Sequence, residues 1–554
     1  MTPSGSPRIR AAATLAVASA LVIGTSATAG ARPVSAAVLA PDTQFTMQAD
    51  GTSGVTAKGA QIPNIDSVKS TIRTYYGAGS NGIANKTASP YISELADIQA
   101  DTLAALPVAG PDDAIVFDAD DTTLWTYDME DAAMHFNFDP VLQNTWVQEK
   151  RFPATPGMVD FVDAVQAKGY DVYGLTGRSA SQEDATLGNL TDVGYSQFNG
   201  DNFFTKFDAT SPKPDYLDCH TGVDPVDDPA KCTTVEYKAG TRKHIEAPVE
   251  EGGLGKNIVL NIGDQWSDLQ GGFSDATLKL PNPTYYLPSP NITGAPAGDS
   301  DLTPRTEFTM APDGSSGATE GGEGIPNIDS VKSTIRTYYG AVNGIANKTD
   351  SPYISELTEF TTTWADKLRH RCATGRDHRE KPAVVFDADD TTLWTYDMED
   401  AAMKFNFDPV LQNTWVQEGR FPATPGMPMV VRAAQKAGCT IVGLTGRKND
   451  QRQATLDNLA SVGYTDKKDE PLFQSQFYFT KWTSSQTPPA YVDCSTDGNP
   501  ASCSTIDYKA STRKYAEEHF GFHIVANLGD QFSDLIGGHA DEPVKLPNPT
   551  YYLP

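Results

Sequence analysis

The sequence predicts an α/β protein made of two tandem copies of one domain, each a parallel sheet with helices on both faces. Two observations support this prediction. The segment 62–77 returns essentially unchanged as 325–340, so the chain contains an internal duplication. Within each copy, short apolar runs alternate with helical patterns, which is typical of parallel strands joined by helices. A period this long excludes solenoids and propellers.

Each copy is expected to start with a helical part, followed by three apolar runs that are long enough for buried strands. In such sheets the ligand site lies beyond the carboxyl ends of the strands. Polar residues that directly follow the runs are therefore candidates for function. The runs are residues 114–117, 172–175 and 258–262 in the first copy, and 383–386, 441–444 and 524–528 in the second.

The likeness between the copies extends to their ends, so the repeated unit is a whole domain. We predict domains at residues 41–288 and 305–554, joined by a flexible linker at 289–304 that is rich in Pro, Gly, Asp and Ser. Two such copies could pack against each other as an internal pseudo-dimer.

Composition narrows the function. The chain has 554 residues with 43 basic and 71 acidic side chains, a formal charge of -28. This charge disfavours binding to nucleic acid or anionic lipid. It also weakly repels phosphorylated small molecules, so a phosphate site needs its own local cations or a metal ion.

The first 37 residues predict a secretory signal peptide, with cleavage near residue 29 or 37. Arginines at 8 and 10 precede an apolar run at 11–23 that ends in small residues. A membrane anchor is the alternative, but the run is shorter than the roughly 20 residues that a span needs. We therefore expect a secreted protein without a membrane anchor after cleavage.

Six cysteines suit an exported protein with a few disulfides. Each copy has a pair that flanks a polar stretch, and each pair is expected to close a local loop. A zinc site is the weaker alternative, because a histidine lies nearby only in the first copy. The expected pairs are Cys219 with Cys232 and Cys494 with Cys503, whereas Cys372 and Cys439 could pair with each other or remain free.

Paired carboxylates follow the first apolar run of each copy. Asp118 and Asp120 come directly after residues 114–117, and Asp387 and Asp389 hold the same positions in the second copy. Carboxylates two positions apart at a strand end can face one crevice once the chain turns. Taken alone, the pair is about as consistent with a helix N-cap.

Further polar motifs follow the other runs and weaken the N-cap alternative. A Thr-Gly-Arg turn offers a hydroxyl and backbone donors to a phosphate oxygen. A Gly-Asp-Gln segment offers carboxylate ligands of the kind that Mg²⁺ prefers. A Tyr-Lys pair places a cation at the start of a helix. These residues are Thr176, Arg178, Lys238, Asp264 and Asp268 in the first copy, and Thr445, Arg447, Lys509, Asp530 and Asp534 in the second.

Two assignments stay open at this point. Other lysines are also shared between the copies, namely Lys206 with Lys481 and Lys243 with Lys514. Asp268 and Asp534 either bind waters of a metal ion or cap the following helix.

These four ordered motifs resemble the haloacid dehalogenase (HAD) superfamily, and within it the acid phosphatase branch with class B acid phosphatases and plant vegetative storage proteins. The likeness covers nearly all of each repeat and includes the closing Lys-Leu-Pro-Asn-Pro-Thr-Tyr-Tyr segment. It implies two Rossmann-like domains, each with a small, mostly helical cap or N-terminal part. It also implies Mg²⁺-dependent hydrolysis of a small phosphate monoester.

The resemblance further implies residue roles. Asp118 would attack phosphorus to form an aspartyl phosphate, and Asp120 would act first as acid and then as base. Mg²⁺ would be held by the Asp118 carboxylate, the Asp120 backbone carbonyl and the Asp264 carboxylate. The residues expected to bind the phosphate or order its loop are Thr122, Thr176 and Lys238, supported by Arg178 and Asp268. The matching residues of the second copy are Asp387, Asp389, Asp530, Thr391, Thr445, Lys509, Arg447 and Asp534.

Two other functions fit the same residues. A phosphotransferase would pass the same aspartyl phosphate to an alcohol. A storage or phosphate-binding protein would keep the fold with weak activity, although the intact aspartate pairs argue against it. Aromatic residues between 125 and 146 are expected mostly to pack in the cap, with some available to stack on a leaving group.

Overall fold

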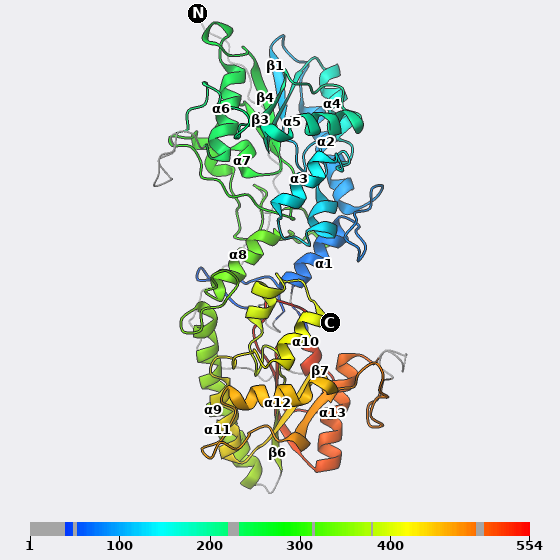
Figure 1. Cartoon of the computed structure of the whole chain (residues 1–554), viewed down its shortest axis with the longest axis vertical. Coiled ribbons are helices and arrows are strands. Elements are labelled where there is room, and N and C mark those ends of the chain that lie inside the picture. The colour runs from blue at the N-terminus through cyan, green and yellow to red at the C-terminus, as the bar shows by residue number, and fades with distance from the viewer. Residues whose placement is uncertain are drawn as a thin grey trace, which may run out of the picture.

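A computed structural model describes residues 39–41, 43–47, 53–219, 232–312, 316–377, 381–494 and 503–553. The expected signal peptide lies outside the described residues. Within the described part, none of the helices combines the length and apolar character needed to cross a membrane. The described chain forms two lobes that meet at a narrow waist (Figure 1).

Each lobe is built on a five-stranded parallel sheet, which confirms the predicted α/β class. The three strands expected in each copy form the centre of its sheet, and a short strand is added at each edge. The first sheet has the order β3-β2-β1-β4-β5, and the second has the matching order β8-β7-β6-β9-β10. The strands are β1 Asp113–Phe117, β2 Asp171–Ser179, β3 Phe203–Lys206, β4 Asn257–Gly263, β5 Ala276–Lys279, β6 Pro382–Phe386, β7 Thr440–Lys448, β8 Tyr478–Lys481, β9 His523–Gly529 and β10 Pro543–Lys545.

Helices connect the strands and cover the sheets. In the first lobe they are α1 Ile65–Tyr75, α2 Pro90–Ala105, α3 Pro140–Gln148, α4 Met158–Ala167, α5 Glu183–Asp192, α6 Thr234–Glu246 and α7 Trp266–Leu269. Their counterparts are α8 Ile328–Tyr338, α9 Pro352–Asp377, α10 Pro409–Gln417, α11 Met427–Ala437, α12 Arg452–Ser461, α13 Thr505–Phe520 and α14 Phe532–Leu535.

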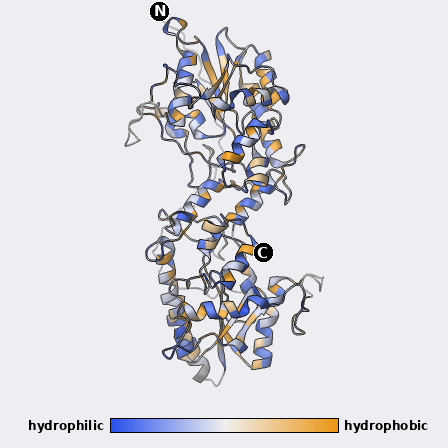
Figure 2. Ribbon diagram, viewed as in Figure 1, coloured by the Kyte–Doolittle hydropathy of each residue, from blue (hydrophilic) through white to orange (hydrophobic). Residues whose placement is uncertain are grey.

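The alternation of side chains along β1 places apolar groups on both faces of the sheet. Phe117 packs on one face, with its ring centroid 6.2 Å from that of Phe161 in α4. Val116 points to the other face, where it joins a core with Tyr237 and Ile245 of α6. Figure 2 shows hydrophobic residues gathered along the strands of both lobes. Because both faces of the sheet are buried, the strands are continuous apolar runs in the sequence.

The two repeats are joined by more than the linker, because each exchanges contacts with the other at the waist. Helices α1 and α8 lie side by side there (Figure 1). The side chain of Asn64 accepts hydrogen bonds from the first turn of α1 and donates to the carbonyls of Asn548 and Tyr551 in the second repeat. Asn327 of the second repeat makes the same bonds to the first repeat, at the carbonyls of Asn282 and Tyr285. The contacts therefore cross the domain boundaries that we predict from sequence.

Buried lysines of the same helices reinforce this exchange. Lys69 of α1 donates to the backbone carbonyl of Phe405, and Lys332 of α8 donates to that of Phe136. Both phenylalanines have positive φ, 59° and 57°, so the loops that carry these carbonyls bend sharply towards the partner repeat. Helix α1 thus begins in contact with the second repeat and continues into the core of the first repeat, and α8 does the reverse.

A densely basic stretch at 367–381 is unlike its counterpart in the first copy and suggests a divergent surface loop rather than a basic binding patch. That interpretation is wrong up to residue 377, because α9 continues through it. Cys372 is fully buried on this helix and forms a disulfide with Cys439. Arg371 pairs with the buried carboxylate of Glu542. Up to residue 377, the stretch is therefore a helical extension of the second repeat.

The two cysteine pairs expected from sequence are also bonded. Cys219 joins Cys232, and Cys494 joins Cys503, at sequence separations of 13 and 9. Among the described residues, none of the cysteines is free.

Replacing Asn64 with alanine is expected to lower the free energy of unfolding by about 2–4 kcal/mol. The change removes a helix cap, worth about 1 kcal/mol, and leaves two carbonyls of the other repeat without their donor. Asn327→Ala should have a similar effect. Denaturant unfolding of both variants measures it, with Asn81→Ala in an exposed turn as the control. Equal stabilities of all three variants and the parent chain would contradict the proposed role of the exchange.

Candidate active site

The central strand of each sheet ends at the candidate nucleophile. Asp118 directly follows β1, and its backbone N–H donates to the carbonyl of Ile262 in β4 at 3.0 Å. The chain then turns sharply, since Asp121 has a φ of 49°, in the left-handed region. The turn places Asp118 and Asp120 in the wall of one cavity beyond the carboxyl edge of the sheet.

A buried lysine compensates the charge of Asp118. Lys238 of α6 donates to Asp118 Oδ1 at 2.5 Å and to Asp268 Oδ1 at 2.6 Å. All three side chains are buried. Burial raises the pKa of Asp118 well above its usual value; Lys238 opposes this rise, and the neighbouring carboxylates add to it. The second repeat repeats the arrangement with Lys509, Asp387 and Asp534.

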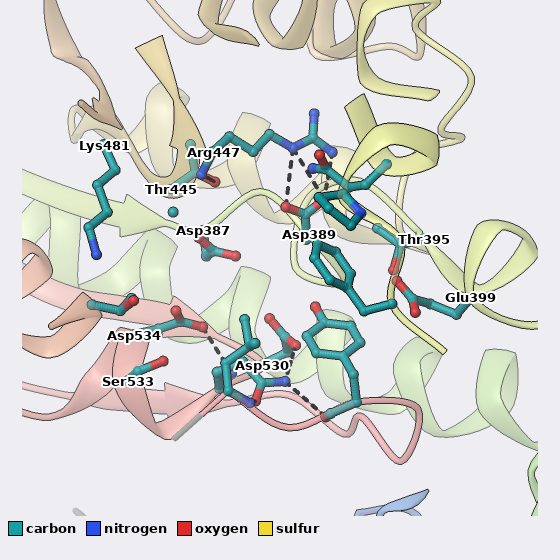
Figure 3. A pocket seen from close by; sticks show the side chains of 18 of the residues that line it. Asp387, Asp389, Thr395, Glu399, Thr445, Arg447, Lys481, Asp530, Ser533 and Asp534 are labelled. Atoms are coloured by element: carbon teal, nitrogen blue, oxygen red, sulfur yellow. Dashed lines mark hydrogen bonds and ion pairs between the residues drawn. The ribbon is translucent and has the colours of Figure 1, made fainter. Parts of the chain in front are cut away.

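Asp120, the candidate acid and base, is bound by the arginine of the Thr-Gly-Arg turn. Arg178 donates from Nη2 to Asp120 Oδ1 at 2.6 Å, and its Nε lies 3.2 Å from both carboxylate oxygens. Arg447 and Asp389 form the same pair in the second repeat. Figure 3 shows this pair on one side of the second cavity, across from Asp530 and Asp534, with Asp387 between them.

Asp264 at the end of β4 completes a group of carboxylates that suits a metal ion. Oxygens of Asp118, Asp264 and Asp268 all lie within 4.8 Å of one another. One oxygen of Asp264 accepts from Asn282 and Gln265, at 2.6 and 2.7 Å, while the other is buried without a hydrogen-bond partner. Such an orphaned buried oxygen beside further carboxylates fits a hard divalent cation. Asp387, Asp530 and Asp534 form the equivalent group.

The structure informs both assignments that the sequence leaves open. Among the shared lysines, Lys238 and Lys509 contact the candidate nucleophiles. Lys481 also lines the second cavity but donates to the carbonyl of Cys503. Asp268 caps the short helix after β4 by accepting from the N–H of Gln265, and it also holds Lys238. The capping role is thus observed, whereas contact with waters of a metal ion stays a prediction.

The threonines occupy buried positions around the loop. Thr122 and Thr176 are fully buried, and the Thr176 hydroxyl accepts from the N–H of Arg178 at 3.2 Å. The Thr391 hydroxyl lies 3.3 Å from a carboxylate oxygen of Asp530. Thr445 lines the second cavity. Their direct contact with a phosphate remains a prediction.

Residue-by-residue reasoning missed three groups at the site. Asp121 is buried and accepts from the N–H and hydroxyl of Thr126, and burial raises its pKa to about 7. Asn282 holds Asp264, and Tyr285 lines the cavity. Asn282 and Tyr285 belong to the closing segment that both copies share. The repetition of this segment was the signal that could have identified them as site residues.

Comparison with protein families decides the relationship. A model of the family described as HAD superfamily, subfamily IIIB (acid phosphatase) matches residues 58–288, 342–487 and 491–554, which together are most of the chain. The chain belongs to this family. The matches lie in both repeats, in accordance with the resemblance of the motifs.

Several curated proteins resemble parts of this HAD-family chain. The stem 28 kDa glycoprotein of Glycine max is 30% identical over 32% of this chain and 61% of its own length. Acid phosphatase 1 of Solanum lycopersicum is 32% identical over 30% of this chain and 58% of its own length. Vegetative storage protein 2 of Arabidopsis thaliana is 26% identical over 30% of this chain and 58% of its own length. The chain thus spans less than two thirds of these relatives.

Among solved structures, the class C acid phosphatase from Bacillus anthracis shares 21% identity with the chain. The match covers 40% of this chain and 86% of that protein, with a TM-score of 0.26. The fold assignment therefore relies on the two sheets described above.

Mg²⁺ is expected to stabilise the protein more at pH 7.5 than at pH 5. Burial raises the pKa of Asp264 and Asp530 to about 6, so below pH 6 a proton must leave before a cation binds. Without metal, the stability of the folded state changes with pH in the opposite direction. The folded state holds protons that the unfolded chain loses near pH 4, so its stability falls as pH rises from 4 to 6.

Thermal unfolding with EDTA or excess Mg²⁺ at both pH values measures this effect. The chain with both Asp264→Asn and Asp530→Asn serves as the control and should lose the Mg²⁺-induced shift. A shift that is as large at pH 5 as at pH 7.5 would count against these carboxylates as ligands.

Proposed function

We propose that the chain is an exported, Mg²⁺-dependent phosphatase that hydrolyses small phosphate monoesters through an aspartyl phosphate on Asp118 and Asp387. The observation that carries this proposal lies at the end of the central strand, where each candidate nucleophile pairs with a buried lysine and belongs to a group of carboxylates whose spacing suits a cation. The proposal is supported by membership of the acid phosphatase family and by a relative named acid phosphatase 1.

In the first step, an oxygen of Asp118 forms a bond to phosphorus while the bond from phosphorus to the ester oxygen breaks. Lys238 lies beside that oxygen and would place a positive charge next to the phosphoryl oxygens. A proton from Asp120 goes to the leaving oxygen. Arg178 makes its short hydrogen bond to Oδ1 of Asp120, so the other oxygen, Oδ2, can carry the proton that goes to the leaving oxygen.

In the second step, Asp120 takes a proton from water as the water oxygen bonds to phosphorus and the bond to Asp118 breaks. The ion pair with Arg178 suits this step, because it holds the Asp120 carboxylate in place in the cavity wall. Free phosphate and the original Asp118 carboxylate result.

A divalent cation would be held by the carboxylates of Asp118 and Asp264 and by the backbone carbonyl of Asp120, with Asp268 close by. When bound, Mg²⁺ supplies positive charge that reduces repulsion between the nucleophile and the phosphate. Asn282 and Gln265 orient Asp264 for this role through hydrogen bonds to one of its oxygens.

Export is part of the proposal. Three disulfides are typical of proteins that leave the reducing cytosol, and the apolar N-terminal run suits a signal peptide. A storage protein remains the second candidate, since vegetative storage proteins are among the relatives. The complete set of aspartates in both repeats favours the enzyme. Competition between water and an added alcohol would separate a phosphatase from a phosphotransferase.

Asp118→Asn and Asp387→Asn are each expected to remove part of the Mg²⁺-dependent hydrolysis of 4-nitrophenyl phosphate. Together they should lower it about a thousandfold or more, because the amide cannot form the covalent intermediate. Steady-state kinetics and trapping of labelled aspartyl phosphate measure the two effects. Asp112→Asn, at an exposed position just before β1, is the matched control. Full activity of the double variant would refute the mechanism.

A further inference from the structure

Each cavity is completed by a carboxylate from the other repeat. Asp329, on the first turn of α8, lines the cavity that contains Asp118. Asp66, on the first turn of α1, lines the cavity that contains Asp387. Asp329 is held by the N–H of Tyr286 at 3.2 Å and by Lys332 at 3.4 Å, and its side chain is 36% exposed.

A second carboxylate in each cavity has no partner of its own. Glu130 lines the first cavity and is only 5% exposed, and within the described chain its side chain makes neither a hydrogen bond nor an ion pair. Glu399 is its equivalent in the second cavity, at 6% exposure. Figure 3 shows Glu399 beside Thr395, on the opposite side of the cavity from Lys481. A buried, unpartnered carboxyl is costly, so its position against the cavity points to a ligand group that satisfies it.

The surroundings of Glu130 favour a full positive charge on that ligand group. Burial raises the pKa of Glu130 well above the usual value; the nearby charges of Asp121, Asp329 and Asp120 add to the rise, and Lys332 opposes it. An arriving cation would relieve this repulsion, whereas a neutral hydroxyl would not. A second metal ion is the less suitable ligand, because Glu130 belongs to neither of the carboxylate groups with metal-binding spacing in the described residues.

An aromatic side chain adds to this preference. Phe138 lines the same cavity, and 65% of its surface is exposed. Phe407 holds the matching position, at 71%. The face of an aromatic ring attracts ammonium groups, including quaternary ones. The net charge of -28 also disfavours approach of a dianionic ester but less so of one that carries an ammonium group.

We propose that Glu130 with Asp329, and Glu399 with Asp66, form a subsite that binds an ammonium group on the leaving side of the substrate. The preferred substrates are then zwitterionic phosphate esters of amino alcohols. This inference rests on the proposed phosphatase function, and it makes each site depend on both repeats.

The test compares kcat/KM for O-phosphoethanolamine and phosphocholine with that for n-propyl phosphate. The leaving group of n-propyl phosphate has a similar length and no charge. The chain is expected to favour O-phosphoethanolamine by about tenfold or more, the usual contribution of one charged hydrogen bond. Phosphocholine has no N–H to donate and should be favoured through its charge and the aromatic ring alone. Glu130→Gln with Glu399→Gln should bring the ratio close to one. Because the ratio is taken within each variant, a general loss of activity cancels.

The contribution of the other repeat's carboxylate to the subsite is tested in a chain that carries Asp387→Asn. In this chain only the first site is expected to turn over substrate. There Asp329→Asn is expected to lower the ratio severalfold, and Asp66→Asn is expected to leave the ratio unchanged. Since Asp329 is partly exposed, this comparison also serves if the glutamate variants do not fold.

Hydrolysis of 4-nitrophenyl phosphate separates the two possible failures. Turnover of this ester without a preference for ammonium esters overturns the subsite and leaves the phosphatase proposal intact. A ratio that stays high in the Gln variants also overturns the subsite. If no phosphate ester is hydrolysed, the proposed function fails and the subsite fails with it.

Discussion

The buried ion pair between Lys238 and Asp118 is the interaction on which each site depends. Three carboxylates lie within 4.8 Å of one another in a buried setting, where like charges repel strongly. The lysine comes from α6, the nucleophile follows β1, Asp264 follows β4 and Asp268 lies in α7. The order of strands in the sheet brings these charges together. Removal of the lysine alone would leave buried carboxylates uncompensated, which is strongly unfavourable. A divalent cation and the lysine are therefore complementary parts of one charge balance.

Much of the fold and site could be predicted because their signals are local. The central strands are continuous apolar runs, and the motifs follow them directly, so the position of Asp118, Lys238 and Asp264 around one cavity was accessible from sequence. The edge strands β3 and β5 were missed because each has only four residues with mixed burial. The pairing of Cys372 with Cys439 was undecided because their separation of 67 residues leaves no local pattern.

Other features depend on contacts between distant segments, which no periodicity reports. The buried state of Glu130 follows from a short π-helix at Met129–Ala133. Asp329 and Asp66 hold equivalent positions in the repeated segments 325–340 and 62–77, and each lines the cavity of the other repeat. The basic stretch of the second copy was taken for a surface loop, because nothing in its local pattern shows that Lys367 and Arg371 pair with the distant Glu542.

The exchange at the waist also concerns how the two halves stay together. Two separate copies of this domain would form the same reciprocal contacts only above their dissociation constant, and dilution would separate them. A covalent link turns that encounter into an intramolecular one, with a local concentration set by the linker and independent of the bulk solution. The duplication thus makes the architecture of both cavities insensitive to dilution, at the cost that neither half can be deleted without removing a wall from the other.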